Sequence, residues 1–328
     1  MWKMQNKNIK FLIIAICVLV IFLLGWFSNL FFQSKQNNDS KLLVIRENSP
    51  EYKYINPLLL NDNFGSSFPQ YVNLKKSIED YISNAINKNN AQSVSMYFRD
   101  LNTGKWTGVG ENEPYVPSSM LKVGVLIAYF KVAEKDSSIL DKKLLYTPKN
   151  NPLQFYKPTH LLTPGYHTVR DLIQQMIVES DNDAFNTLSH EYPEEISNVF
   201  SALKILYPSE SPDDFLSASV YSRLFRTLYN GTYLSHANSE EALKLLTYTS
   251  FNKGLVAGVA SSTIVAHKFG EHSVFEDGIL SDRELHDCGI VYYPQKPYFL
   301  CVMTKGKNFA NLEKIISDIS KIVFTYIN

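Results

Sequence analysis

The sequence predicts an α+β domain in which one antiparallel sheet is built from both ends of the domain around an all-helical region, with one transmembrane helix in front. Residues 11–32 contain no charged side chain. Strand-like segments occur near both ends of residues 71–328, and helical periodicity dominates between them. Because strands from both ends must meet to bury their apolar faces, the middle of the chain becomes an inserted helical layer.

Composition and charge narrow the class of protein. Of the 328 residues, 45% are hydrophobic and 20% are charged, which is typical of a globular protein with a substantial core. The 32 basic residues balance the 32 acidic ones, so no net field attracts nucleic acid or an anionic surface. We therefore expect no nucleic-acid partner.

The N-terminal apolar segment has the length of a membrane-spanning helix. About 20 apolar residues cross a bilayer as a helix, and residues 11–32 meet this requirement. A cleaved signal peptide, the alternative, has a shorter apolar core of roughly 7–15 residues before a small-x-small site, and 28–32 shows no such pattern. Three lysines within residues 1–10 favour a cytoplasmic N-terminus and place the chain after Phe32 outside.

After the membrane segment the chain changes character twice. Residues 33–70 are polar and irregular, which is typical of a linker followed by an extended segment. A folded domain is expected over 71–328. Its first predicted elements are an amphipathic helix, a two-strand hairpin with Asn and Gly in its turn, and a long helix, at 71–88, 93–99 with 105–109, and 119–133.

The remaining predicted elements are the helices of the inserted layer and the last strands and helix of the domain. Thr168 and Asp171 have the spacing of a capping box and predict a helix that runs to Glu179. Further helices are expected at 184–189, 219–229 and 312–326, and strands at 263–268, 289–293 and 298–304.

Two of the three cysteines fall on predicted neighbouring strands. If the strands are joined by a two-residue turn at 294–295, Cys288 and Cys301 lie opposite each other, where side chains can touch. The third, Cys17, lies in the membrane segment. Two buried free thiols are the favoured interpretation, and a disulfide is the alternative.

A serine and a lysine begin the long helix after the hairpin. Ser119 lies three residues before Lys122, so both side chains share one helix face about one turn apart. An amine can accept the serine proton if burial lowers its pKa, while the helix N-terminus stabilises negative charge. Alone, the pattern is more typical of a helix cap and a solvated lysine. The apolar run 123–130 favours the catalytic interpretation because a lysine beside a buried helix is costly without partners.

Two further segments carry side chains of catalytic type. Residues 180–182, Ser-Asp-Asn, lie between two predicted helices, where a loop offers a hydroxyl and a carboxamide. Residues 267–270, His-Lys-Phe-Gly, lie at the end of a predicted strand, where Lys268 can hold an anionic group and Gly270 allows close approach to the backbone. Taken singly, each is more typical of a helix cap and of an edge-strand lysine.

In this order, the three segments resemble the Ser-x-x-Lys, Ser-Asp-Asn and Lys-Thr-Gly motifs of the class A β-lactamases and penicillin-binding proteins. The resemblance covers 71–328 and extends to the order of secondary structure. It implies that family's sandwich with a helical subdomain and a serine hydrolase that forms an acyl-enzyme. It requires no metal and no organic cofactor.

The resemblance implies a catalytic role for four residues. Ser119 is the acylated nucleophile, and Lys122 is its proton acceptor or relay. Ser180 passes a proton to the leaving amine, and Lys268 is the electrostatic partner of Ser180 and of a substrate carboxylate.

The resemblance also implies a binding site. Asn182 contacts the substrate amide, and Phe269 and Gly270 line the site. The backbone amides of Ser119 and of His272 form the oxyanion hole.

Two departures from the family pattern bear on turnover. Phe269 replaces the hydroxyl residue of the third motif, which removes a hydrogen bond to a substrate carboxylate and adds bulk. No Glu-x-x-Leu-Asn segment, whose glutamate activates the deacylating water in class A enzymes, comes after the second motif. Three loop carboxylates are weak substitutes and are more typical of a solvated loop: Glu210, Asp213 and Asp214.

The functional expectation is a membrane-anchored, extracytoplasmic serine hydrolase acting on β-lactams or peptidoglycan-like amides. Its expected partners are a small-molecule β-lactam or cell-wall peptide and the membrane itself. The alternatives are a penicillin-binding-type D-Ala peptidase and a binding or sensor module that deacylates slowly or not at all. His286 and Asp287 are best explained as a strand-entry turn, with a metal or acid–base pair as the alternative.

Overall fold

The structure, a computed structural model, describes residues 44–46, 51–61, 68–149, 154–206, 215–276 and 278–328. The predicted transmembrane helix at 11–32 lies outside the described residues. In the described part of the chain, no helix has the length and apolar character needed to cross a membrane.

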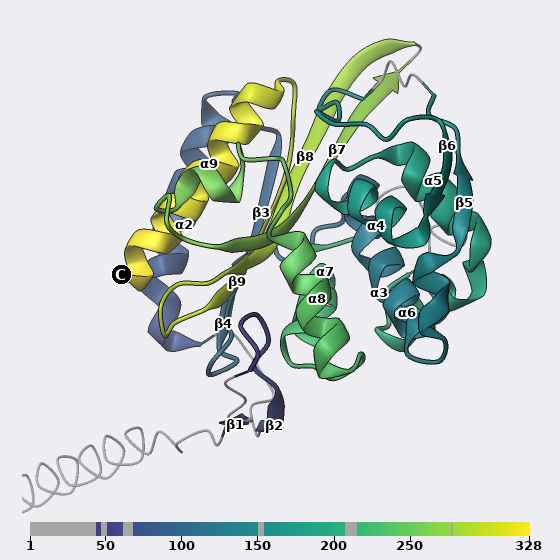
Figure 1. Cartoon of the computed structure of the whole chain (residues 1–328). Coiled ribbons are helices and arrows are strands. Elements are labelled where there is room, and N and C mark those ends of the chain that lie inside the picture. Colours follow the sequence, from purple (N-terminus) through teal and green to yellow (C-terminus); the bar gives the residue numbers. More distant parts are fainter. Residues whose placement is uncertain (1–43, 47–50, 62–67, 150–153, 207–214, 277) are drawn as a thin grey trace, which may run out of the picture. The chain divides into compact units, whose positions relative to one another are not determined.

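The central sheet takes strands from both ends of the domain, as the sequence predicts (Figure 1). Its order is β4-β3-β9-β8-β7, and neighbouring strands are antiparallel. The strands are β3 (Ser93–Asp100), β4 (Trp106–Val109), β7 (Val265–Glu276), β8 (Ile279–Val291) and β9 (Tyr298–Gly306). β7 is therefore an edge strand, and one side of its backbone is free to face another layer.

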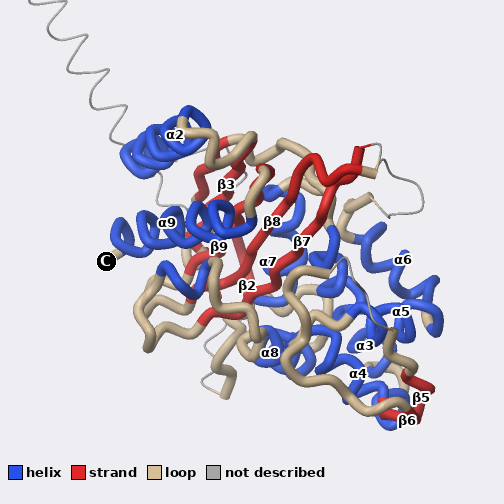
Figure 2. Tube along the Cα trace, turned by 90° about the horizontal axis from the view of Figure 1, so that it is seen from above, coloured by secondary structure: helices blue, strands red, loops and turns tan. Residues whose placement is uncertain are grey.

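Helices cover both faces of this sheet (Figures 1 and 2). On one face, α2 (Val72–Asn87) and α9 (Phe309–Ile327) share a core with the strands, in which Ile78 and Ile316 pack with Val302. On the other face, Ile290 of β8 belongs to the same core as Ile127 of α3 (Lys122–Ala133). Burial of apolar side chains on both faces holds the sheet between two helical layers.

The second layer is the inserted helical region. Besides α3 it contains the short 3₁₀ turn η2 (Ser118–Leu121), α4 (Val169–Val178), α5 (Asn182–Glu191), α6 (Pro193–Ala202), α7 (Ala218–Tyr229) and α8 (His236–Leu246). α3 is buried on all sides, as expected of a helix without a polar face. The capping box predicted for α4 is confirmed: the Thr168 hydroxyl accepts from the Asp171 N–H, and the Asp171 carboxylate accepts from the Thr168 N–H.

The folded unit begins upstream of residue 71, the expected start of the domain. β1 (Val44–Arg46) and β2 (Leu58–Asn61) form a two-stranded sheet, and contacts assign 44–328 to one unit. The segment between them is held by Glu240 of α8, whose carboxylate accepts three consecutive backbone N–H groups at 2.6–2.8 Å, those of Lys53, Tyr54 and Ile55. Polar composition alone did not reveal these bonds.

The strands β7 and β8 are longer than predicted. They continue to pair with each other from Glu271↔Leu285 to Glu276↔Ile279, where polar side chains hide the alternation that marks a strand. His286 and Asp287 consequently lie inside β8 and not in a strand-entry turn, which corrects that interpretation. Among the described α-helices and strands of residues 71–328, those not predicted individually are α6, α8 and the small hairpin of β5 (Lys143–Tyr146) with β6 (Gly165–Thr168).

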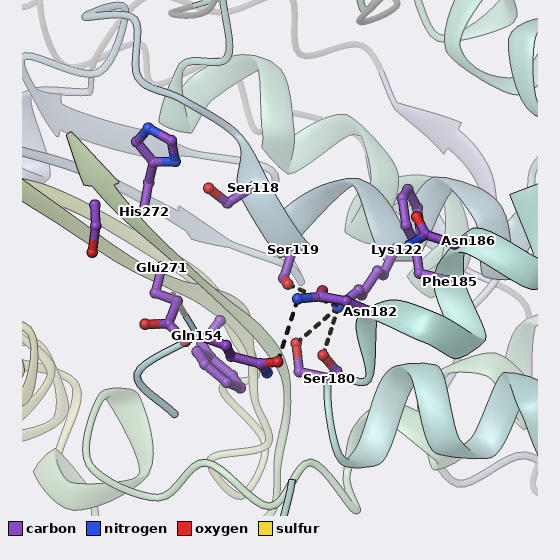
Figure 3. Close-up of a pocket in the computed structure, with 12 residues that line it drawn as sticks. Ser118, Ser119, Lys122, Gln154, Ser180, Asn182, Phe185, Asn186, Glu271 and His272 are labelled. Carbon is purple, nitrogen blue, oxygen red and sulfur yellow. Dashed lines mark hydrogen bonds between the residues drawn. The ribbon is translucent and has the colours of Figure 1, made fainter. Parts of the chain in front are cut away.

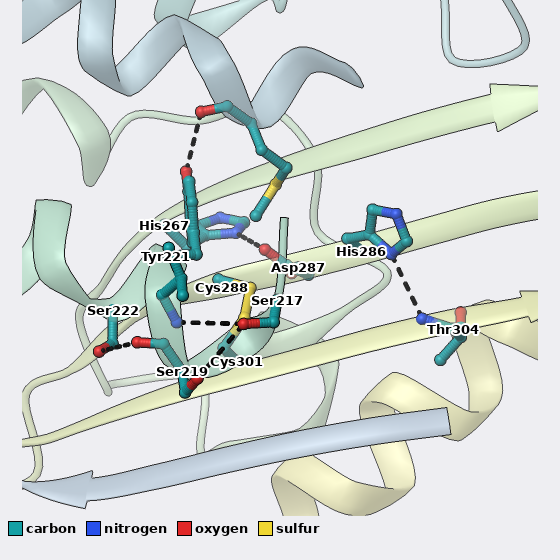
Figure 4. The surroundings of a disulfide bond; sticks show 12 residues. Ser217, Ser219, Tyr221, Ser222, His267, His286, Asp287, Cys288, Cys301 and Thr304 are labelled. Carbon is teal, nitrogen blue, oxygen red and sulfur yellow. Dashed lines mark hydrogen bonds and ion pairs between the residues drawn. A yellow bond between two sulfur atoms is a disulfide. The ribbon is translucent and has the colours of Figure 1, made fainter. Parts of the chain in front are cut away.

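Cys288 and Cys301 form a disulfide bond (Figure 4). They lie directly opposite each other on β8 and β9, in the register predicted from the turn at 294–295. The favoured expectation of two free thiols is wrong, because opposite side chains on paired strands come within bonding reach. Both residues are fully buried between the sheet and the inserted helices.

Candidate active site

Ser119 lies in η2, the turn that leads into α3. The turn is anchored from two sides: the Tyr221 hydroxyl donates to the Met120 carbonyl at 3.1 Å, and β7 packs directly against it. A Cβ on Gly270 would lie 2.9 Å from the Met120 side chain and 3.1 Å from the Pro117 carbonyl. Gly270 is therefore needed for the close approach of β7 to the serine turn.

Lys122 connects two of the three segments that the sequence singles out (Figure 3). Its Nζ lies 2.9 Å from Ser119 Oγ. It also contacts the main-chain oxygen of Ser180 at 2.6 Å, the Oγ of Ser180 at 3.3 Å and the Oδ1 of Asn182 at 2.7 Å. The side chain is fully buried. The helix that carries Lys122 thus aims one amine at two hydroxyls and two carbonyl-type oxygens.

Burial lowers the pKa of Lys122 to about 7, although the charges of Asp181 and Glu271 oppose this shift. Near neutral pH a large fraction of the amine is therefore uncharged. A neutral amine has two N–H donors and one lone pair. Because the Ser180 carbonyl and the Asn182 Oδ1 can only accept, they take the two donors and leave the lone pair for a serine hydroxyl.

Ser180 stands between two lysines. Its Oγ accepts from Lys268 Nζ at 2.8 Å and lies 3.3 Å from Lys122 Nζ. The backbone of Ser180 has φ 54°, a left-handed conformation that is costly for a residue other than glycine. Burial, reinforced by the charge of Lys122, holds the pKa of Lys268 well below its usual range, while Asp287 and Glu271 act against this.

Asp181 has a structural task in the same segment. Its carboxylate caps α5 by accepting the N–H groups of Asp183 and Ala184, each at 2.8 Å, and it accepts the Tyr146 hydroxyl at 2.8 Å. This cap places Asn182 at the start of α5, with its side chain directed at Lys122 and, through Nδ2, at Gln154 Oε1 3.4 Å away. The aspartate orients the loop, and its neighbours supply the polar groups.

The free edge of β7 presents the backbone amide of Glu271, not that of His272, to the serine turn. The carbonyl of Ile264 accepts from Tyr292 after β8, whereas those of His267 and Phe269 accept from Thr249 and Lys268 away from β8. In an antiparallel ladder N–H and C=O alternate together between the two sides, and the β7–β8 register is regular through this stretch. The expected His272 amide therefore points to β8, and the second oxyanion donor is reassigned to the Glu271 amide.

These groups surround a cavity of about 460 Å³, which we call the cleft. Its lining consists of two walls and Gln154: the helical wall, with Ser118, Ser119, Lys122, Ser180, Asn182, Phe185 and Asn186, and the strand wall, with Phe269, Glu271, His272 and Ser273. The structure thus brings Ser119, Lys122, Ser180 and Lys268 into one hydrogen-bonded chain.

A family model described as the β-lactamase enzyme family matches residues 74–327. The chain belongs to this family. The fold is similar to that of PBP-A, with a TM-score of 0.65 and 20% sequence identity over 81% of this chain and 99% of that one. It is also similar to that of the TLA-3 extended-spectrum β-lactamase, with a TM-score of 0.66 and 20% identity over 77% of this chain and 99% of that one. A third similar fold is that of a β-lactamase from Xanthomonas campestris pv. campestris, with a TM-score of 0.64 and 17% identity over 78% of this chain and 99% of that one. No curated protein matches the chain.

Membership of the β-lactamase family confirms the resemblance stated from the three motifs and the α+β fold that it implied. It also identifies the chain as a β-lactamase-like serine hydrolase by family. The catalytic and binding roles of the individual residues stay predictions, for which the geometry above is the physical basis.

Glu271 is the cleft residue that sequence reasoning missed as a side chain. It is the only acidic residue lining the cleft in the described part of the chain. Its two oxygens accept the backbone N–H groups of Phe155 at 3.1 Å and Tyr156 at 2.9 Å. Burial raises its pKa, and these two hydrogen bonds partly offset the rise. Its place directly after the Lys-x-Gly motif could have drawn attention to it.

A second group that sequence reasoning did not assign lies behind the serine turn. Glu284 and His286 of β8 are fully buried and both bond to Val116: the Val116 N–H donates to Glu284 at 3.1 Å, and the His286 Nε2 lies 3.1 Å from the Val116 carbonyl. Burial acts to raise the pKa of Glu284, but His286, the Val116 N–H and Lys305 together hold it below its usual value. This pair holds the segment at Val116 that enters the serine turn.

The three loop carboxylates considered as water activators, Glu210, Asp213 and Asp214, lie outside the described residues. Among the residues that the structure describes, no group of three or more His, Cys, Asp or Glu side chains is arranged to hold a metal ion. His286 and Asp287, considered as a pair, point to opposite faces of β8, since successive side chains of a strand alternate. Asp287 instead contacts His267 at 2.7 Å.

Proposed function

We propose that this member of the β-lactamase family is an extracytoplasmic serine hydrolase, anchored in the membrane by residues 11–32, that forms an acyl-enzyme on Ser119. Its substrates are β-lactams or peptidoglycan-like amides. The observation that carries the proposal is the position of Lys122 Nζ, 2.9 Å from Ser119 Oγ with its donors committed elsewhere and its pKa near 7.

The proposed acylation follows from this arrangement. The neutral Lys122 takes the Ser119 proton while Oγ attacks the substrate carbonyl, and the amides of Ser119 and Glu271 stabilise the oxyanion. As the C–N bond breaks, the Ser180 hydroxyl donates its proton to the leaving nitrogen. Ser180 is reprotonated by Lys122, which returns to its neutral form, and Lys268, 2.8 Å from the Ser180 oxygen in the structure, holds that oxygen in place.

A penicillin-binding type of behaviour is the second candidate, and one observation favours it. Glu271, the single carboxylate lining the described part of the cleft, accepts one backbone N–H on each oxygen, which makes it a weaker base toward water. In this second candidate function, acylation of Ser119 is not followed by rapid deacylation. Among the proteins of similar fold, a mutant of PBP-A forms an acyl-enzyme complex with penicillin G.

The disulfide supports the extracytoplasmic location. Cross-links between buried cysteines persist in oxidising compartments and are rare in the cytosol. Together with the lysines before residue 11, it favours a folded unit outside the membrane.

The test is intact mass of the full-length protein in detergent micelles, followed over time after mixing with penicillin G and with a chromogenic cephalosporin. A mass increase equal to the lactam, mapped to Ser119, is expected, and its persistence separates the two candidates. Rapid loss with colour release identifies a β-lactamase. A protein that gains no mass at Ser119 from any acyl donor contradicts the proposed function.

A further inference from the structure

The strand wall of the cleft does not offer a substrate carboxylate a free cation. Lys268, the residue that would bind it, is fully buried and donates to Ser180 Oγ at 2.8 Å and to the Phe269 carbonyl at 3.0 Å. The Phe269 ring covers the ammonium, with its centroid 4.3 Å from Nζ. Because Lys268 has no exposed surface and this ring lies against its ammonium, a carboxylate in the cleft does not contact it in this arrangement.

The Phe269 ring is held firmly in that position. It stacks on Phe251, with ring centroids 4.3 Å apart and an angle of 21° between the planes, and it meets the edge of Tyr156 at 5.6 Å. Only 3% of Phe269 is exposed. Moving the ring would break up an aromatic cluster, which costs packing energy in a buried site.

Two residues further along the same face of β7, the cleft carries a negative charge. Glu271 is half-buried and lines the cavity, and beside the imidazole of His272 the other ionisable residue lining the described cleft is Lys122, whose amine is directed at Ser119 and Ser180. Each Glu271 oxygen accepts one N–H and keeps a second lone pair. An anionic group placed against this wall meets a like charge in a poorly solvated site, whereas an ammonium group meets an acceptor.

We propose that Glu271 and Phe269 select acyl donors that carry no carboxylate beside the scissile bond, and that the cleft prefers neutral or cationic groups there. The inference rests on the proposed function and specifies its substrate class. Glu271 is the specificity-determining residue because its carboxylate lines the strand wall, against which that group would lie, and Phe269 removes the compensating cation from reach.

Three compounds with one acyl-donor ring test the charge preference directly: penicillin G, its methyl ester and its diethylaminoethyl ester, which carry an anion, no charge and an ammonium. Second-order rate constants for adduct formation are measured by intact mass on the full-length protein. We expect the ammonium ester to react fastest and the free acid slowest, with a difference of about tenfold or more between acid and methyl ester at low salt.

The variant Glu271→Gln separates this effect from the intrinsic reactivity of the three compounds. Its ester-to-acid rate ratio should fall about tenfold relative to the parent protein, because the like charge is removed while the side-chain volume is kept. The matched control is Glu313→Gln. Glu313 accepts the Tyr156 hydroxyl at 2.6 Å and so anchors the same loop, but it does not line the cleft. Its ratio should equal that of the parent.

The outcomes are distinguishable. If Ser119 is acylated but Glu271→Gln leaves the ratio unchanged, or Glu313→Gln lowers it equally, the charge selection is overturned while the proposed function stands. If none of the three compounds acylates Ser119, the inference fails, and the proposed function fails with it when the cephalosporin and a D-alanyl peptide also leave Ser119 unmodified. A free acid that reacts faster than both esters in the parent protein also overturns the inference.

Discussion

The two walls of the cleft differ in how closely they match the family motifs. The helical wall carries Ser119, Lys122 and Ser180 in direct hydrogen-bond contact. The strand wall keeps the lysine and glycine of its motif, but Phe269 and Glu271 occupy the positions that face a substrate. Under the proposed function, bond-making chemistry depends on the first wall and the choice of substrate depends on the second. The hydrogen-bonded arrangement of Ser119, Lys122 and Ser180 does not by itself determine which substrate is attacked.

The largest expected effect tests the helical wall alone. Replacing Ser119 by Ala should abolish adduct formation with every acyl donor, because the Lys122 lone pair then has no nucleophilic hydroxyl to activate in the serine turn. Ser118→Ala is the matched control, since Ser118 is the neighbouring hydroxyl in the same cavity, and it should still be acylated. Peptide mapping of the adduct decides between the two serines. An adduct that still forms in Ser119→Ala would show that Ser119 is not the nucleophile, and the functional distinction between the two walls would fail.

The next effect concerns the base. Lys122→Met should lower the acylation rate constant by roughly 10²–10⁴-fold, the usual contribution of a positioned general base. Lys131→Met, on the same helix, keeps the cleft intact because Lys131 bonds to Glu134 and the Tyr233 carbonyl, and it should react at the parent rate. Stopped-flow or quenched mass measurements give both rates.

The pH profile tests Lys122 as that base. Because the neutral amine accepts the proton, the acylation rate should rise about tenfold per pH unit below the pKa of about 7 and level off above it. Lys122→Met should lose this rise. If the acylation rate of the parent protein does not change between pH values of about 5 and 9, deprotonation of Lys122 does not control the reaction.

A smaller effect is expected behind the walls. Glu284→Ala leaves the Val116 N–H without a partner and loosens the entry to the serine turn, so we expect acylation to slow by roughly tenfold with substrate binding little changed. Glu240→Ala is the control, since it also frees backbone N–H groups but in a segment that does not line the cleft. Equal slowing in both variants would mean that general destabilisation explains the effect.

The sequence predicted the helical wall better than the strand wall for a physical reason. Ser119 and Lys122 lie one helical turn apart, so sequence spacing alone places them together. The choice between the His272 and Glu271 amides depends on which backbone groups of β7 face β8, and this becomes visible only with the ladder register. Similarly, the polar continuation of β7 lacks alternation and was not recognised as strand.

Long-range contacts account for the remaining differences. Glu240 holds a segment 186 residues earlier, and Glu271 holds a loop 115 residues earlier, which no local pattern reports. The disulfide could be predicted from the sequence only in part. Its register followed from the turn at 294–295, but whether the thiols are bonded depends on the compartment as well as on geometry.

The smallest effect on catalysis is expected from that disulfide, which cross-links β8 and β9 without lining the cleft. Cys288→Ala with Cys301→Ala should leave the acylation rate near the parent value. It should lower the free energy of unfolding by about 3 kcal/mol, as expected for a cross-link that closes a short loop. Urea unfolding of the parent protein with and without reductant measures the same contribution of the disulfide to the free energy of unfolding. Identical unfolding curves would mean that the thiols are not cross-linked, and the support for an oxidising compartment would be withdrawn, whereas the difference between the two walls would stand.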